Sequence, residues 1–185
     1  MTFKIVWGIT GTGYVLKESI DLMKSLQENQ DIKITVIISK EGAVVVKIYK
    51  QWEYLNEVIK NVKVEITPNK PFIAGPLQLG KYDLFLVCPV SANTVAKIVV
   101  GIADTLITNC VAQTIKGGIP VYLFPSDQHL EPIVTARPDG SPLILKIRDI
   151  ELENIKKLKR MEGIVVLSDF DEVKKTLLRK IKENN

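Results

Sequence analysis

The sequence predicts a doubly wound α/β fold, in which helices cover both faces of a mostly parallel sheet. Strand and helix patterns alternate along the 185 residues, and this alternation is typical of parallel strands joined by right-handed crossovers. Several strands are apolar on nearly every successive residue, notably 34–38, where Thr35 is the exception, 84–87 and 121–124. Such continuous runs indicate strands whose sheet is buried on both faces.

Local patterns predict the elements in order. Apolar runs bounded by turn residues predict strands, and apolar residues at helical spacing predict helices. Glycines and prolines punctuate loops at 68–80 and 125–142. In the first half we expect strands at 3–9, 32–38, 62–66 and 84–88, with helices at 14–27 and 42–55. In the second half we expect a helical stretch at 94–115 divided near Gly101, strands at 120–124, 143–147 and 164–167, and helices at 151–161 and from Asp169 onward.

Composition indicates one globular domain spanning residues 1–185, with 143–185 as a C-terminal extension of that domain. The longest apolar run, 84–90, is far shorter than the ~18 residues of a membrane span. The first strand leads into glycines instead of a cleavage site, so we expect a cytoplasmic protein without a membrane partner. A net charge of +4, spread along the chain, gives no sign of a nucleic-acid partner.

The two cysteines, Cys88 and Cys110, are too few to hold a zinc ion or an iron–sulfur cluster. Both lie in apolar stretches, which favours buried free thiols over a disulfide. We therefore expect no metal site.

The fold class directs attention to the residues that follow each strand. In a Rossmann- or flavodoxin-like three-layer sandwich, ligands bind outside the carboxyl ends of the strands, where the strand order reverses. The first such segment is Gly8-Ile-Thr-Gly-Thr-Gly. Its glycines allow an anion to approach backbone amides, although they also suit a tight turn. The spacing matches neither the dinucleotide fingerprint nor a P-loop, which argues against an NAD site and an NTPase.

Two further segments carry polar groups at the same expected edge. Ser39 directly follows the second strand, where it is either a helix N-cap or a donor to a phosphate held by the first loop. The segment Pro89-Val-Ser-Ala-Asn-Thr follows a buried strand and opens a helix. Capping accounts for one of its polar side chains but not for Ser91, Asn93 and Thr94 together.

This last segment resembles the Pro-Ala-Ser-Ala-Asn-Thr signature of the homo-oligomeric flavin-containing cysteine decarboxylase superfamily. The resemblance extends to the Gly-Ile-Thr-Gly start and to Ser39, and covers residues 3–128. It implies an FMN cofactor, with the first loop and Ser39 on the phosphate and the later segment on phosphate, ribityl or ring. The implied FMN-binding residues are Thr10, Gly11, Thr12, Gly13, Ser39, Pro89, Ser91, Ala92, Asn93, Thr94 and Ser126.

Within the superfamily, the chain is most similar to the archaeoflavoproteins, which are close to the acceptor-type dihydromethanopterin reductases. Segments 47–50, 72–76 and 159–164 carry this narrower resemblance. It implies a flavoprotein that accepts electrons from a ferredoxin-like donor. The alternatives are hydride transfer from FMN to a pterin such as dihydromethanopterin, and a structural or regulatory FMN-binding subunit without turnover.

Missing residues disfavour two other activities of the superfamily. Decarboxylase members carry a histidine before the strand that feeds the signature, whereas this chain has Gly75-Pro-Leu-Gln there. Because glycine cannot exchange a proton, cysteine decarboxylation is disfavoured. Prenylated-flavin synthases carry an Arg-Glu pair after the fifth strand, whereas this chain has Ser126-Asp127. A prenyl phosphate would therefore lack its arginine partner.

The sequence leaves the roles of several other residues open. His129 and Asp127 lie in a loop at the ligand-facing end, and the sequence assigns a catalytic role to neither. The aromatic residues Tyr49, Trp52 and Tyr54 either shield a flavin or pack in the core. The stretch 95–115 is apolar over most of its circumference, which predicts burial between subunits of a trimer-based homo-oligomer.

Overall fold

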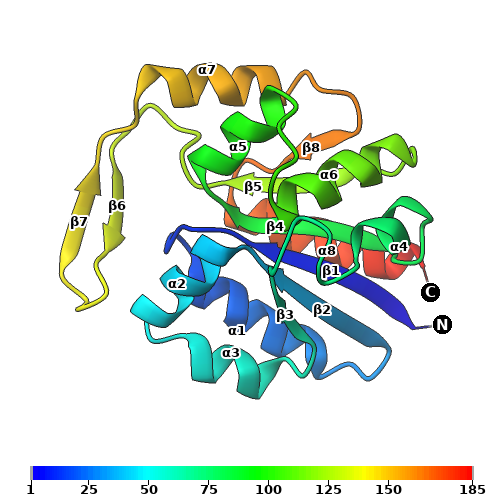
Figure 1. The fold of residues 1–185 in the computed structure, drawn as a ribbon. Helices are drawn as coiled ribbons and strands as arrows, with labels where there is room; N and C mark the ends of the chain where they lie inside the picture. The colour runs from blue at the N-terminus through cyan, green and yellow to red at the C-terminus, as the bar shows by residue number, and fades with distance from the viewer. Residues whose placement is uncertain (1, 185) are drawn as a thin grey trace.

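A six-stranded parallel sheet forms the centre of the protein, in a computed structural model that describes residues 2–184. The strand order is β3-β2-β1-β4-β5-β8, and every neighbouring pair is parallel. The doubly wound fold predicted from the sequence is confirmed (Figure 1). The strands of this sheet are β1 (Phe3–Ile9), β2 (Ile32–Ile38), β3 (Val62–Val64), β4 (Leu84–Val90), β5 (Val121–Pro125) and β8 (Ile164–Val166).

Helices cover both faces of the sheet, and each face has its own apolar core. One core joins the sheet to α1 (Leu16–Gln27), α2 (Lys40–Ile48), α3 (Trp52–Val58) and α8 (Phe170–Glu183). The other joins it to α4 (Ala74–Gln78), α5 (Ala92–Val99), α6 (Leu106–Lys116) and α7 (Asp149–Leu158). Burial on both faces is the reason that the central strands are apolar on successive residues. Within residues 2–184, no helix is both long and apolar enough to cross a membrane.

The structure corrects the expected helix at 42–55. The chain forms two helices there, α2 and α3, separated by Tyr49, Lys50 and Gln51. Lys50 has a left-handed backbone with φ of 55°, which ends α2 and redirects the chain. The amphipathic pattern continues across the break because both helices pack on the same core, so the pattern alone did not reveal it.

The expected loop at 125–142 and strand at 143–147 also differ from the structure. The strands β6 (Ile133–Ala136) and β7 (Pro142–Leu145) form a separate antiparallel hairpin, which extends away from the main sheet (Figure 1). Val134 and Ile144 on it are both 70% exposed. The chain then returns through α7 to place β8 beside β5 at the edge of the main sheet.

The apolar stretch 95–115 is covered largely within the chain. It forms α5 and α6, separated by a turn at residues 100–105. The helix α4 packs on α6 and α7 packs on α5, so neighbouring helices bury surface that the sequence assigned to a subunit interface. Val100 and Ile102, in the turn, remain exposed.

The end of α6 is packed directly against the end of α4. A Cβ atom built on Gly117 would lie 2.2 Å from the carbonyl oxygen of Gln78. We expect Gly117→Ala to lower the free energy of unfolding by about 3 kcal/mol, because a backbone atom must move to accept the methyl group. The neighbouring Gly118 has open space around it and φ of +74°, so Gly118→Ala should cost only about 1 kcal/mol of backbone strain. Chemical denaturation of both variants measures the difference, and equal losses would contradict the packing.

Both cysteines are buried free thiols, as the sequence predicts. Burial raises the pKa of Cys88 and of Cys110 to about 12. A raised pKa keeps each thiol protonated in the folded protein, while the unfolded thiols ionise above about pH 9. Stability should therefore fall as pH rises through that range. We expect neither thiol to react with a disulfide reagent at pH 8 until denaturant is added, and rapid reaction of the folded protein would contradict this burial.

Candidate functional site

The loops that follow β1 and β4 meet where the strand order reverses, and Thr10 holds them together. The hydroxyl of Thr10 donates to the carbonyl oxygen of Pro89 at 3.2 Å and accepts from the backbone N–H of Ser91 at 2.7 Å. The backbone N–H of Thr10 also donates to Pro89. Thr10 is 1% exposed and Pro89 is buried, so both position the two loops and present no surface to a ligand.

Backbone amides of these loops remain available to a ligand. Within residues 2–184, the N–H groups of Gly11 and Gly13 have no hydrogen-bond partner. The helix α5 begins at Ala92, and the first N–H groups of any helix lack partners inside it. Its dipole also favours negative charge at this end. The loops therefore present donors of the kind that bind a phosphate group.

Ser39 caps α2, and the cap leaves it free for the second role that the sequence offered. Its hydroxyl oxygen accepts from the N–H of Gly42 at 3.0 Å and so caps α2. Its own N–H donates to the carbonyl oxygen of Ile9, which ties the cap to the end of β1. A capping hydroxyl still has its O–H to donate. Capping and phosphate binding by Ser39 are therefore compatible.

An open cavity of about 570 Å³ lies at the carboxyl ends of these strands. Its size suits a small-molecule cofactor. It is lined by five of the residues predicted from the sequence together with seven others: Gly11, Ser39, Ser91, Asn93 and Thr94, with Lys40, Glu41, Glu65, Ala96, Lys97, Asp104 and Thr105.

Other predicted residues lie on a second, smaller cavity of about 60 Å³, between the first loop and the hairpin. Thr12, Gly13 and Ser126 line it, together with Asp127. The hydroxyl of Ser126 donates to the Asp127 carboxylate, which accounts for both side chains without a ligand. The first loop thus separates the predicted set into two groups. Ala92 lines neither cavity.

Tyr49 joins the first loop to the hairpin. A Cβ atom on Gly13 would lie 2.3 Å from the ring of Tyr49, so only glycine permits this approach. The hydroxyl of Tyr49 donates to the carbonyl oxygen of Ala136 in β6 at 3.1 Å. Tyr49 is therefore the aromatic residue that lies against the candidate site. Trp52 has Lys47 over its ring at 5.0 Å, and Tyr54 donates to Asp21, so these two stabilise the helices.

Glu65 is a site residue that the sequence analysis missed. It follows directly after β3, is 7% exposed, and lines the larger cavity. The rule of inspecting residues after strands would have found it, but the expected strand at 62–66 placed Glu65 inside the strand. The structure ends β3 at Val64, which brings Glu65 to the ligand-facing edge.

The charged groups of the larger cavity are unevenly paired. Lys97 contacts both carboxylate oxygens of Asp104 at 2.9 Å, which neutralises one cation and one anion. Glu65 accepts only a long bond of 3.3 Å, from the backbone N–H of Lys40. Within the described chain Glu65 forms no ion pair.

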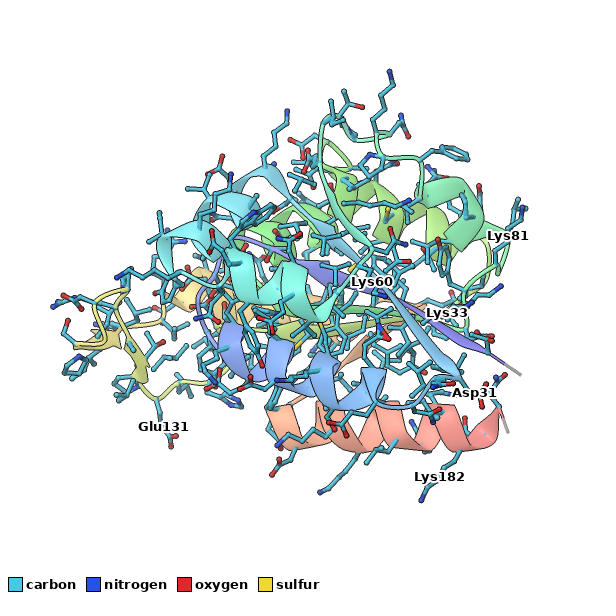
Figure 2. The ribbon with its side chains drawn as sticks, turned by 90° about the horizontal axis from the view of Figure 1, so that it is seen from below. Asp31, Lys33, Lys60, Lys81, Glu131 and Lys182 are labelled. Carbon is cyan, nitrogen blue, oxygen red and sulfur yellow. The ribbon has the colours of Figure 1, made fainter. Side chains whose placement is uncertain are left out.

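His129 is exposed, and its ring lies 3.1 Å from the carbonyl oxygen of Ser168 in the loop before α8. It lines neither of the two cavities described above. Another cavity, of about 610 Å³, lies at the opposite end of the sheet and is lined by Lys4, Lys33 and Lys60. Figure 2 shows Lys33 and Lys60 at this end, on the side away from the hairpin and Glu131. The amino ends of parallel strands are not where doubly wound sheets bind cofactors.

The sequence profile of the Flavoprotein family matches residues 1–181. The chain belongs to the Flavoprotein family. This membership confirms the resemblance found in the sequence and the expectation of a flavin cofactor.

Relatives of the chain include archaeal proteins and one bacterial structure. An acceptor-type dihydromethanopterin reductase of Methanosarcina mazei is 34% identical, over 92% of this chain and 97% of its own. Another, of Methanocaldococcus jannaschii, is 39% identical over 75% of this chain, which corresponds to 59% of that longer protein. The DmrB protein of Burkholderia xenovorans, solved with FMN as a cubic protein cage for redox transfer, is 31% identical with a TM-score of 0.82, over 98% of this chain and 96% of its own.

Proposed function

We propose that this protein is an FMN-dependent oxidoreductase that reduces a dihydropterin. The observation that carries the proposal is the polar cavity at the strand-order reversal, which combines free amides, hydroxyls and the start of α5. Phosphate fits these donors. The dihydromethanopterin reductases among the relatives, and the likeness to DmrB with bound FMN, support the choice of cofactor and substrate class.

The chain's own residues bind and position the cofactor in this proposal. Gly11 donates its backbone N–H, and Ser39 donates its hydroxyl, to the phosphate, because both line the larger cavity. Asn93 and Thr94, on the exposed side of α5, hold the ribityl or the ring. Thr10 fixes the distance between the two binding loops. FMN supplies the redox chemistry when bound.

The stretch 75–83 supports a reductase over a cysteine decarboxylase. Decarboxylase members carry a histidine in the corresponding stretch, and this chain has none between residues 75 and 83. At the position of the prenyltransferase arginine lies Ser126, whose hydroxyl is occupied by Asp127.

Electrons for the flavin come from a separate ferredoxin-like protein in this proposal. Residues 1–185 contain two cysteines, both buried thiols, and an iron–sulfur cluster needs about four ligands. The net charge of +4 suits an acidic donor. We also propose a homo-oligomer that buries exposed apolar residues such as Phe72, Val100 and Ile102. The cage formed by DmrB supports this assembly.

Asn93→Ala tests the cofactor site. The change removes an amide that lines the larger cavity, so we expect FMN affinity to fall about three- to tenfold, as for one lost hydrogen bond. Quenching of flavin fluorescence during titration of the apoprotein measures the affinity. Asn56→Ala, on α3 and outside the cavity, is the matched control. Equal affinities in both variants would show that Asn93 does not contact the cofactor.

Anaerobic reoxidation tests the reaction. We expect the photoreduced FMN-loaded protein to regain its oxidised flavin absorbance when 6-methyl-7,8-dihydropterin is added, with tetrahydropterin formed in equal amount. Reduction of the oxidised protein by ferredoxin, compared with NADPH, then identifies the donor. A flavin that stays reduced in the presence of dihydropterin would contradict the proposed substrate class.

A further inference from the structure

Glu65 is a largely buried carboxylate, 7% exposed, with a single hydrogen-bond partner among residues 2–184. One oxygen, Oε2, accepts a single 3.3 Å bond from the backbone N–H of Lys40. The other, Oε1, accepts no hydrogen bond from residues 2–184, and the side chain lines the 570 Å³ cavity. A carboxyl group with one partner in the chain keeps acceptor capacity for a ligand that enters the cavity.

The cavity does not supply donors to Glu65 from charged side chains. Lys97 is engaged by both oxygens of Asp104, and the side chain of Lys40 takes part in no ion pair among the described residues. Glu41, on the same cavity, is exposed and hydrated. A carboxylate also repels a phosphate group, so Glu65 does not bind the FMN phosphate. A donor-rich ligand explains its presence in a cofactor cavity.

We propose that Glu65 binds the 2-amino and N3–H edge of the pterin ring. This inference rests on the proposed function and names the residue that recognises its substrate. The 2-amino-4-oxo ring of a pterin carries two parallel N–H donors on one edge. Two carboxylate oxygens accept such a pair in a bidentate arrangement, as they do from a guanidinium group.

The flavin ring is a poorer partner for Glu65. Its N3–H lies between two carbonyl groups, so a carboxylate that accepts this hydrogen also approaches carbonyl oxygens. The ribityl hydroxyls each offer a single donor. The pterin edge alone places two donors side by side with no acceptor between them, which is the pattern that two carboxylate oxygens require.

This orientation leaves the reactive end of the pterin free. The bond between N5 and C6 of a dihydropterin lies at the other end of the bicyclic ring from the 2-amino group. Reduction adds a hydride to C6 and a proton to N5, with the hydride coming from the reduced cofactor and the proton from solvent. Glu65 is thus a specificity-determining residue, and it takes no part in the bonds that form or break.

The experiment compares two ligands on the FMN-loaded wild-type protein. The probes are 6-methylpterin and its analogue without the 2-amino group, each titrated by calorimetry so that no turnover is needed. We expect the analogue to bind about tenfold or more weakly, because it leaves one carboxylate oxygen without a donor. Equal binding of the two ligands by the wild-type protein would overturn the assignment before any variant is made.

Two variants then test whether Glu65 is the residue that distinguishes the two ligands. Glu65→Gln keeps the shape of the side chain but replaces one acceptor with a donor, so we expect 6-methylpterin affinity to fall about tenfold and the preference over the analogue to disappear. Glu41→Gln removes the same charge from an exposed residue of the same cavity, and the preference should persist. Thermal unfolding of both variants checks that the fold is retained.

Each other result has a distinct meaning. If Glu65→Gln weakens FMN binding and leaves the pterin preference intact, Glu65 serves the flavin and the inference is wrong. If Glu65→Gln changes neither ligand, Glu65 has only its contact with α2, and the inference is again wrong. If the wild-type protein binds FMN but no pterin at all, the proposed function itself fails.

Discussion

The pairing of β1 with β4 is the constraint on which the site depends. These two central strands lie side by side in register, from Ile5 opposite Leu84 to Gly8 opposite Val87. The chain continues from each into opposite layers of the sandwich, because α1 packs in one core and α5 in the other. The two following loops therefore diverge and leave an opening between them. Buried hydrogen bonds, from Trp7 Nε1 to the Cys88 carbonyl at 2.6 Å and through Thr10, fix this junction.

The sequence predicts the main sheet because its signal is local. Each central strand is a short apolar run, and burial on both faces makes that run continuous. The hairpin β6–β7 has a weaker signal, because half of β6 and three of the four residues of β7 are exposed. The sequence accordingly predicted a strand only near β7, at 143–147. The sequence also did not reveal the break between α2 and α3. The left-handed residue there is Lys50, and a left-handed turn is recognisable in a sequence mainly when a glycine occupies it.

The sequence predicted those candidate-site residues that carry a local signal. Gly11 lies in a glycine-rich turn that follows a strand, and Ser39 lies between a strand and the helix that it caps. Glu65 escaped because its importance depends on where β3 ends, and element ends are the least certain part of a sequence pattern. Thr10 was assigned to the cofactor, but its burial makes it a brace between loops. Its role follows from its partners, which only the fold specifies.

The charge arrangement of the cavity explains why neutral donors suit the proposed phosphate site. A lysine in the first loop would bind phosphate well, but it would also be drawn to Glu65 across the same cavity. Backbone amides and a hydroxyl attract an anion without offering the carboxylate a permanent partner. Two lysines line the cavity: Lys97 is paired with Asp104, and Lys40 forms no ion pair among residues 2–184. In the proposal, Glu65 is therefore left as an acceptor for a ligand that brings its own paired donors.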